Sequence, residues 1–474
     1  MSTLEPTDGE ASLGALASDR IGVWPPGPAT PGAIQSAQWL FRPIQFMERC
    51  RAKYGPIFSI SLGTAQNVVV VGEPAAAASV IGGDPEIFRS GEANLLFRPV
   101  LGRHSLLVLD VPEHSEHRRI LLPPFKAGHV QGFGQMIEDV ARARVSSWPL
   151  GEEFALTSEM QAITYGAISR VAFGDQVEER DTRLAELSLE MMDRCDSPFT
   201  LVPKLRVQAG GLSPYARLMK VVQEIDQLLF AAIAERRADP LSQMRDDVLS
   251  LMIHAQHDDG TPLTDREIRD ELLTLLMAGY ETTTSALTWA FERLLRSPEV
   301  VSRLREELES GDETYLDAVV KESLRERTVV PIVARKLRVP IELGQFELPA
   351  GTVVMASVYL VHHDPEIYPE PYEFRPERFL GGPPRANAWI PFGGGVRRCL
   401  GANFAQLEMR TVIRTVLTAA KLRPARAEPE PRARRRFTLA PKHGCRVVVD
   451  ELDGVSAPTT TTRFRRSRRA RETV

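Results

Sequence analysis

A cysteine at the end of a glycine-rich run is the residue of this chain best suited to do chemistry. Cys399 lies in the segment FGGGVRRCLG, residues 392–401. The glycines permit tight turns and a close approach of the backbone to a flat ligand. An apolar helical pattern follows at once, so we expect Cys399 at a helix N-terminus, where amide groups and the helix dipole favour a thiolate. A thiolate is an electron-donating axial ligand for ferric iron.

Two other interpretations of this loop remain open from the residues alone. A single cysteine in a glycine-rich turn is more often a buried structural residue. A glycine-rich loop before a helix can also hold a phosphate, although the GxGxxG spacing is absent and no strand leads directly into the loop.

A polar group interrupts an apolar helical stretch at AGYETT, residues 278–283. Gly279 costs about 1 kcal/mol relative to alanine inside a helix, and we expect that it and Ala278 leave room for a ligand. Thr282 follows Ala278 by four residues, so its hydroxyl can compete for the Ala278 carbonyl. With the carboxylate of Glu281 beside it, this alcohol is a candidate proton relay. The alternative is a buried helix with an incidental polar patch.

The loop and the hexapeptide together resemble the haem-thiolate monooxygenases, the cytochromes P450. The family's oxygen-binding helix matches residues 278–283, and the resemblance runs from about residue 25 to residue 449. The fixed positions of the family's ligand loop are all filled here, by Phe392, Gly395, Arg397, Cys399 and Gly401.

The resemblance implies haem b, iron protoporphyrin IX, as the cofactor and Cys399 as the ligand of its iron. Phe392 would pack near the sulfur, Arg397 would pair with a haem propionate, and Gly401 would let its helix pass close under the porphyrin. Thr282 and Glu281 would deliver protons to iron-bound dioxygen.

The resemblance also implies further propionate contacts. His114 and Arg118 stand at i and i+4 of a segment similar to the family's third helix, and Arg335 fits a further propionate arginine. A lone histidine is otherwise more often a satisfied surface or core residue.

Glu322 and Arg325 stand at i and i+3, which alone predicts an ordinary helix pair worth a few tenths of a kcal/mol. The family pattern implies instead a buried pair joined by Arg378 of the PERF segment, residues 376–379. A carboxylate between two guanidiniums can be bound bidentately, so we expect this triad to support the cysteine loop rather than to act in catalysis.

Segments that match the family's substrate pocket are apolar, which predicts a lipophilic small-molecule substrate such as a fatty acid, terpenoid, steroid or polyketide. Simple core packing is the alternative for each residue. The candidate lining residues are Leu95, Leu96, Phe97, Leu275, Val329, Val330, Ile332 and Leu439.

The chain shows no flavin or nicotinamide motif and no iron–sulfur cysteine set. We therefore expect the two electrons for dioxygen to come from a separate ferredoxin and an NAD(P)H-dependent reductase, docking on a basic patch of Arg397, Arg398 and Arg410. A peroxide-dependent or peroxide-rearranging haem-thiolate enzyme is an alternative that would not need the intact Glu281–Thr282 pair. A non-catalytic haem sensor is another.

The elements that would position these residues are mostly helical. One long helix is predicted from residue 263 to about residue 296, begun by a capping box at Thr264 and Glu267. A hairpin at residues 57–62 and 67–71 and extended segments at 339–343, 352–359, 437–439 and 445–449 supply a small β part, and residues 423–436 are expected to form a surface loop. The predicted fold class is mainly α with small β-sheets, an α+β cytochrome P450 fold in a single large domain.

Composition sets the remaining limits. The formal net charge is −4, which gives no reason to expect nucleic-acid binding. Four scattered cysteines form neither a zinc motif nor a disulfide framework, no stretch is long and apolar enough for a transmembrane anchor, and we expect a cytoplasmic protein. We expect the haem domain at residues 24–450, between a disordered stretch at 1–23 and a disordered basic tail at 451–474, which is either simply solvated or binds an anionic partner or membrane surface.

Overall fold

The computed structural model describes residues 23–452, apart from residues 64, 175–178, 196, 198–205, 207–210, 212, 383–384, 386 and 436. The disorder expected for residues 1–22, and for the basic tail from residue 453 onward, lies outside the described residues.

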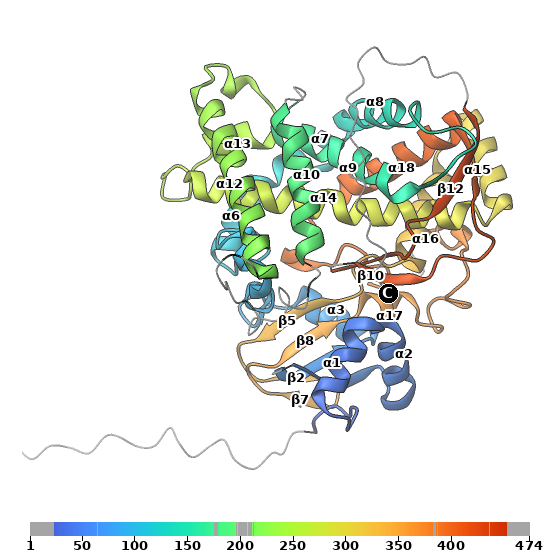
Figure 1. The fold of residues 1–474 in the computed structure, drawn as a ribbon. Coiled ribbons are helices and arrows are strands. Elements are labelled where there is room, and N and C mark those ends of the chain that lie inside the picture. The colour runs from blue at the N-terminus through green and yellow to red at the C-terminus, as the bar shows by residue number, and fades with distance from the viewer. Residues whose placement is uncertain are drawn as a thin grey trace, which may run out of the picture.

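A long helix, α14 (Asp265–Leu294), crosses the helical part of the molecule (Figure 1). Its 30 residues correspond to about 45 Å at ~1.5 Å per residue. The expected capping box is present, because the Thr264 hydroxyl accepts the N–H of Glu267 and the Glu267 carboxylate accepts the N–H of Thr264 at 2.8 Å. The prediction of this helix and of its start is confirmed.

The other helices pack around α14, with α9 (Leu156–Phe173) and α18 (Ala402–Ala419) in direct contact with it. Apolar side chains of these three helices form the largest buried core, so α14 is fixed on several sides. The further helices are α1 (Gly32–Phe41), α2 (Pro43–Tyr54), α3 (Pro74–Gly82), α4 (Ser90–Ala93), α5 (Arg98–Leu101), α6 (Glu113–Leu121), α7 (Ala127–Val130), α8 (Gly134–Val145), α10 (Glu179–Cys195), α12 (Pro214–Ala238), α13 (Val248–His254), α15 (Pro298–Ser310), α16 (Thr314–Glu326) and α17 (Val358–His362).

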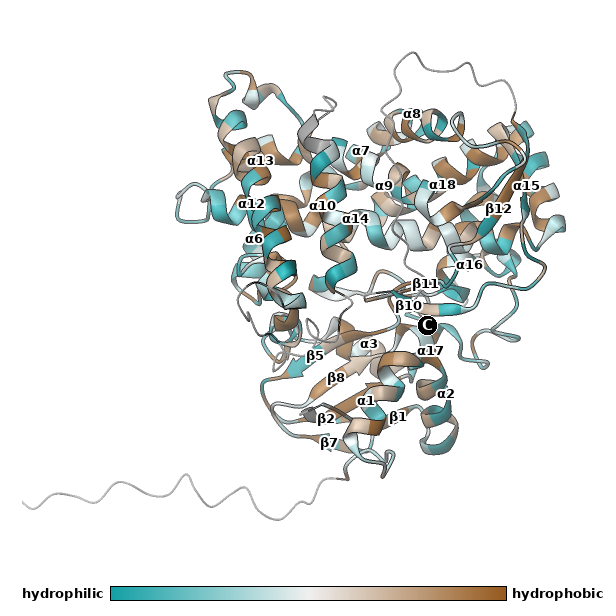
Figure 2. Ribbon diagram, viewed as in Figure 1, coloured by the Kyte–Doolittle hydropathy of each residue, from teal (hydrophilic) through white to brown (hydrophobic). Residues whose placement is uncertain are grey.

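A five-stranded sheet lies to one side of the helical part and has the order β1-β2-β8-β5-β3 (Figure 1). The predicted hairpin is present as β1 (Ile57–Leu62) and β2 (Ala65–Val71), antiparallel with Ile57 opposite Val71. β2 then pairs in parallel with β8 (Val353–Ala356), whose other neighbour is β5 (Val333–Leu337), and β3 (Phe88–Arg89) closes the edge. Figure 2 shows β8 as mainly hydrophobic, in keeping with a central strand.

Three small sheets complete the β part. β12 (Arg446–Leu452) lies between β4 (Glu153–Ala155) and β9 (Ala420–Pro424), β6 (Ile341–Leu343) pairs with β7 (Phe346–Leu348), and β10 (Arg432–Arg435) pairs with β11 (Thr438–Pro441). The mainly helical fold class with small sheets is confirmed.

Two local predictions are wrong. The segment 423–436, expected to be a loop, contains the end of β9 and the whole of β10, because tertiary contacts outweigh the low strand propensity of its residues. The predicted strand at 352–359 ends at Ala356, because the Ser357 hydroxyl accepts the N–H of Leu360 at 3.1 Å and caps a new helix, α17.

Candidate functional site

The cysteine loop lies between the PERF segment and α18. A short 3₁₀ turn covers Gly395–Arg397, and the Cys399 N–H closes the loop by donating to the Phe392 carbonyl at 2.9 Å. Gly395 has φ +59°, and a Cβ there would come within 3.0 Å of the Gly82 Cα in α3. This position therefore requires glycine both for its conformation and for the close approach of α3.

Cys399 lies beside α18 but not within it, because that helix begins at Ala402 with Gly401 as its N-cap. Burial raises the pKa of the Cys399 thiol, while the Gly401 N–H and the charges of Arg118 and Arg398 lower it. The amide at the helix terminus therefore favours the thiolate, as expected, while desolvation of the thiol opposes it more strongly. The cysteine is nevertheless accessible and not in a disulfide, so its sulfur can bind a metal, whose charge deprotonates a coordinating thiol.

A cluster of basic side chains gathers near this cysteine from three segments. His114 and Arg118 come from α6, Arg335 from β5 and Arg397 from the cysteine loop. Burial first, and then the charges of Arg397 and Arg118, lower the pKa of His114 to about 3, so it is neutral. Burial likewise lowers the pKa of Arg335 and of Arg397 to about 10, while Asp110 opposes this shift in both.

These guanidiniums face little compensating negative charge among the described residues. Arg397 Nη2 lies 2.9 Å from Asp110 Oδ1, but within the described part of the chain Arg335 bonds only to the Ser90 hydroxyl and to backbone carbonyls. Uncompensated buried cations are costly, so the cluster suits a ligand with two carboxylates. A Cβ added at Gly401 would meet no atom of the residues that the structure describes within 4 Å, which leaves space for a flat group beside Cys399. The donor set and this space fit a haem.

Asp110 is a site residue that the sequence analysis did not single out. Besides Arg397, its carboxylate accepts the N–H groups of Gly91 at 2.8 Å and Glu92 at 2.9 Å. It therefore joins the loop before α6 to the start of α4 and orients Arg397. The only local signal was its place just before Pro112 in a turn.

The helix that carries His114 and Arg118 is tied to α14 by a buried pair. His117 Nδ1 shares a hydrogen bond of 2.8 Å with Glu271 Oε1, and Glu271 Oε2 accepts the N–H of Leu106 at 3.2 Å. Although burial opposes it, the hydrogen bond and charge of Glu271 raise the pKa of His117. Arg397 Nη1 donates to the Leu106 carbonyl at 3.1 Å, so one loop connects α14 with the cysteine loop.

On α14, Thr282 makes the bond that its spacing from Ala278 predicts. The Thr282 hydroxyl donates to the Ala278 carbonyl at 2.7 Å, and Glu281 is fully buried. Gly279 is needed at this position for packing, and not to leave room for a ligand as expected. A Cβ there would meet Ile168 Cγ1 of α9 at 2.6 Å, so the glycine permits close packing of α9 on α14.

The structure brings the predicted triad together. Glu322 and Arg325 are both fully buried, with Nε–Oε2 and Nη2–Oε1 distances of 2.7 Å, and Arg378 Nε lies 3.4 Å from Glu322 Oε1. Arg325 also donates to the carbonyls of His362 and Pro371. The triad thus fastens α16 to the segment before the cysteine loop.

The candidate pocket residues differ in how deeply they are buried. Leu95 and Leu96 are exposed on a 3₁₀ turn, and Phe97 is partly buried against Phe437 with ring centroids 6.2 Å apart. Val329 and Leu439 are buried, and the Leu439 N–H donates to the Val329 carbonyl at 2.8 Å. Leu275, Val330 and Ile332 are partly buried.

The expected basic docking patch is wrong in one member. The Arg397 side chain is only 9% exposed and donates to the carbonyls of Leu106 and Leu109, so it cannot face a partner. Arg410 is partly buried and pairs with Asp317 at 3.2 Å. Arg398 is exposed.

Comparisons with known proteins agree with this geometry. The family model described as Cytochrome P450 matches residues 25–445. A putative cytochrome P450 135B1 of Mycobacterium tuberculosis is 36% identical over 445 residues, which cover 92% of this chain and 94% of that relative. A putative cytochrome P450 137 of the same organism is 35% identical over 438 residues, covering 91% and 92%.

Solved structures share the fold. The cyanobacterial CYP120A1, described as retinoic acid bound, has a TM-score of 0.80 at 23% identity and covers 90% of this chain and 99% of its own. The cytochrome P450DA heme domain has a TM-score of 0.77 at 21% identity, with coverage of 91% and 98%. Among the described residues, no helix combines the length and the hydropathy needed to cross a membrane.

Proposed function

Since the chain belongs to the cytochrome P450 family of haem-thiolate monooxygenases, we propose that it inserts one oxygen atom of dioxygen into a lipophilic small molecule. Cys399 would hold the haem iron, with Phe392 and Gly401 beside it. His114, Arg118, Arg335 and Arg397 would bind the two propionates. When bound, haem supplies the iron at which dioxygen is activated, and thiolate donation favours O–O cleavage.

The observation that carries the proposal is the buried acid next to a hydroxyl on α14. The Thr282 hydroxyl donates to the Ala278 carbonyl at 2.7 Å, so its oxygen keeps lone pairs that can accept a proton. Glu281, the preceding residue in the sequence, is buried and would supply that proton. Ala278 would line the space next to this pair. A monooxygenase needs such proton delivery, whereas a peroxide-driven enzyme does not.

The substrate and the electron donors are part of the proposal. Phe97, Leu275, Val330 and Ile332 remain partly accessible apolar residues, which supports a lipophilic substrate. Two electrons would come from a separate ferredoxin and an NAD(P)H-dependent reductase that docks near exposed Arg398. Cys50, Cys399 and Cys445 are not joined in disulfides, which supports a reducing compartment such as the cytoplasm.

Labelled dioxygen tests this proposal. The purified haem protein would be supplied with a surrogate ferredoxin system and a panel of fatty acids, steroids and retinoic acid, the last because of the ligand of the cyanobacterial structure. We expect ¹⁸O₂ to place one labelled atom in the product and the second in water. Products formed only with added peroxide, and none with electron donors, would contradict a monooxygenase and favour the peroxide-dependent alternative.

A further inference from the structure

We propose that Arg435 is a positioning residue for Glu281. Its guanidinium, carried on β10, holds the buried carboxylate in the place and the charge state from which Glu281 exchanges protons with Thr282. This inference rests on the proposed function, because it assumes that Glu281 and Thr282 form the relay.

The ion pair joins two parts of the chain that are far apart in sequence. Arg435 Nε lies 3.6 Å from Glu281 Oε1. The Glu281 side chain has no exposed surface, whereas the Arg435 side chain is 29% exposed. A 3.6 Å separation is longer than a hydrogen bond, so this contact is electrostatic. It stabilises the charged carboxylate without occupying that oxygen as an acceptor.

The strand that carries Arg435 is fixed to the same face of α14 as Glu281. Trp289 and Glu292 follow Glu281 by 8 and 11 residues, which at ~100° per residue places all three within an arc of about 80°. Trp289 Nε1 donates to the Leu439 carbonyl of β11 at 2.9 Å. Arg435 is opposite Thr438 in the β10–β11 pair. The β10–β11 hairpin is therefore held at a fixed position on α14.

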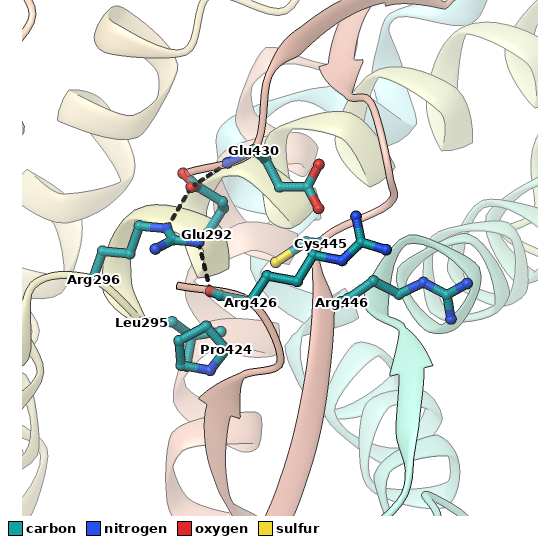
Figure 3. Close-up of a pocket in the computed structure, with 8 residues that line it drawn as sticks. All are labelled: Glu292, Leu295, Arg296, Pro424, Arg426, Glu430, Cys445 and Arg446. Carbon is teal, nitrogen blue, oxygen red and sulfur yellow. Dashed lines mark hydrogen bonds and ion pairs between the residues drawn. The ribbon is translucent and has the colours of Figure 1, made fainter. Parts of the chain in front are cut away.

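A second anchor lies just before β10. Figure 3 shows the Glu292 carboxylate between Arg296 and the backbone of Glu430, with an Nε–Oε1 distance of 2.8 Å and an N–Oε1 distance of 3.1 Å. Arg296 Nη2 also donates to the Arg426 carbonyl at 3.2 Å. Because the chain is anchored on both sides of Arg435, the backbone of this residue is held beside the face of α14 that carries Glu281.

The neighbouring arginines of β10 have other partners. Arg432 Nη2 lies 3.0 Å from Glu326 Oε1 of α16, and Arg434 Nε donates to the Leu40 carbonyl of α1 at 3.2 Å. Strand alternation turns Arg434 away from Arg435. Arg434 is thus a matched control, since it shares the strand and the side-chain type but not the contact with Glu281.

The proton balance follows from this pair. Glu281 rests as a carboxylate, takes up a proton from solvent and passes it to the Thr282 oxygen while the Thr282 hydroxyl proton moves on, which returns Glu281 to a carboxylate. A fully buried carboxylate is unfavourable without a nearby cation. Arg435 compensates this charge, so it acts through Glu281 and not on a substrate.

The test compares Arg435→Ala, Arg435→Gln and Arg435→Lys with Arg434→Ala and Glu281→Gln, all as haem-loaded protein. The first readout is the infrared carbonyl stretch of a protonated carboxylic acid at neutral pH, assigned to Glu281 by its absence in Glu281→Gln. We expect this band in the alanine and glutamine variants of Arg435. The wild type, Arg434→Ala and the lysine variant should lack it, because each keeps a cation at position 435.

The second readout needs no substrate. Reduced with a surrogate ferredoxin system, each protein consumes oxygen, and the fraction released as hydrogen peroxide is measured. We expect that fraction to rise in Arg435→Ala and Arg435→Gln, with proton delivery slowed roughly tenfold, less than the 10²–10⁴-fold of a full loss of acid–base catalysis. In Glu281→Gln/Arg435→Ala the second change should add nothing to the first.

The failures are distinguishable. Wild-type infrared spectra and peroxide release in the Arg435 variants, with Glu281→Gln impaired, would overturn the role of Arg435 and leave the relay in place. Wild-type peroxide release in Glu281→Gln would remove the relay and the role of Arg435 with it. Equal effects in Arg434→Ala would show a general disturbance of β10 and would also overturn the proposal.

Discussion

Replacing Glu322 with alanine is expected to destabilise the protein by about 3–5 kcal/mol, the range found when one partner of a buried ion pair is removed. The variant would leave the fully buried Arg325 guanidinium without its carboxylate and would free Arg378 and the Arg375 N–H, which also bonds to Glu322 at 2.9 Å. Because these groups fix the segment before the cysteine loop, we also expect the variant to retain little haem.

Denaturant unfolding and the haem content of the purified protein measure this effect. Glu322→Gln keeps the shape of the side chain, so its stability and haem content should lie between those of the wild type and Glu322→Ala. This variant can be measured even if the alanine variant does not fold. The matched control is Glu451→Ala, which breaks an exposed pair with Lys421 and should change stability by less than about 1 kcal/mol. Equal stability of Glu322→Ala and Glu451→Ala would contradict the structural role of the triad.

The second large effect is expected at Thr282. Thr282→Ala removes the hydroxyl that bonds to the Ala278 carbonyl, so a proton can no longer pass through this position. We expect oxygen consumption to continue while product per oxygen falls roughly tenfold or more, within the scale of positioned acid–base groups. Hydrogen peroxide release, measured beside product, should account for the lost oxygen.

Two variants sharpen this prediction. Thr282→Ser keeps a hydroxyl and should retain most of the coupling. Thr288→Ala removes a hydroxyl with the same bond, to the carbonyl four residues earlier at 2.7 Å, but further along α14 from Glu281, and should leave coupling unchanged. Coupled turnover at the wild-type level in Thr282→Ala would remove the relay from the account.

Features with local physical causes could be predicted from the sequence. The start of α14 follows from a capping box of Thr264 and Glu267 that needs no distant contact. The bond from Thr282 to Ala278 follows from their spacing on a helix. The tight cysteine loop follows from its glycines, since Gly393 and Gly395 both take positive φ.

Features that depend on distant segments could not be predicted in the same way. Gly279 reads locally as room for a ligand, and only the position of Ile168 on α9 shows that it serves helix packing. Arg397 reads as a surface charge, but loop carbonyls and Asp110 bury it. The arginine-rich sequence of residues 423–436 alone indicates a loop, because the acidic partners of β10, Glu326 and Glu281, lie in distant segments. No pattern within one segment contains these partners.

Cys399 is assigned as the thiolate ligand of the haem iron, and the carbon-monoxide difference spectrum of the reduced, purified protein is the decisive test of this assignment. We expect a strongly red-shifted Soret band, the mark of an axial thiolate, which Cys399→Ala should abolish while Cys50→Ala retains it. A histidine-type band, or no band at all in protein that is otherwise folded, would contradict the assignment of Cys399.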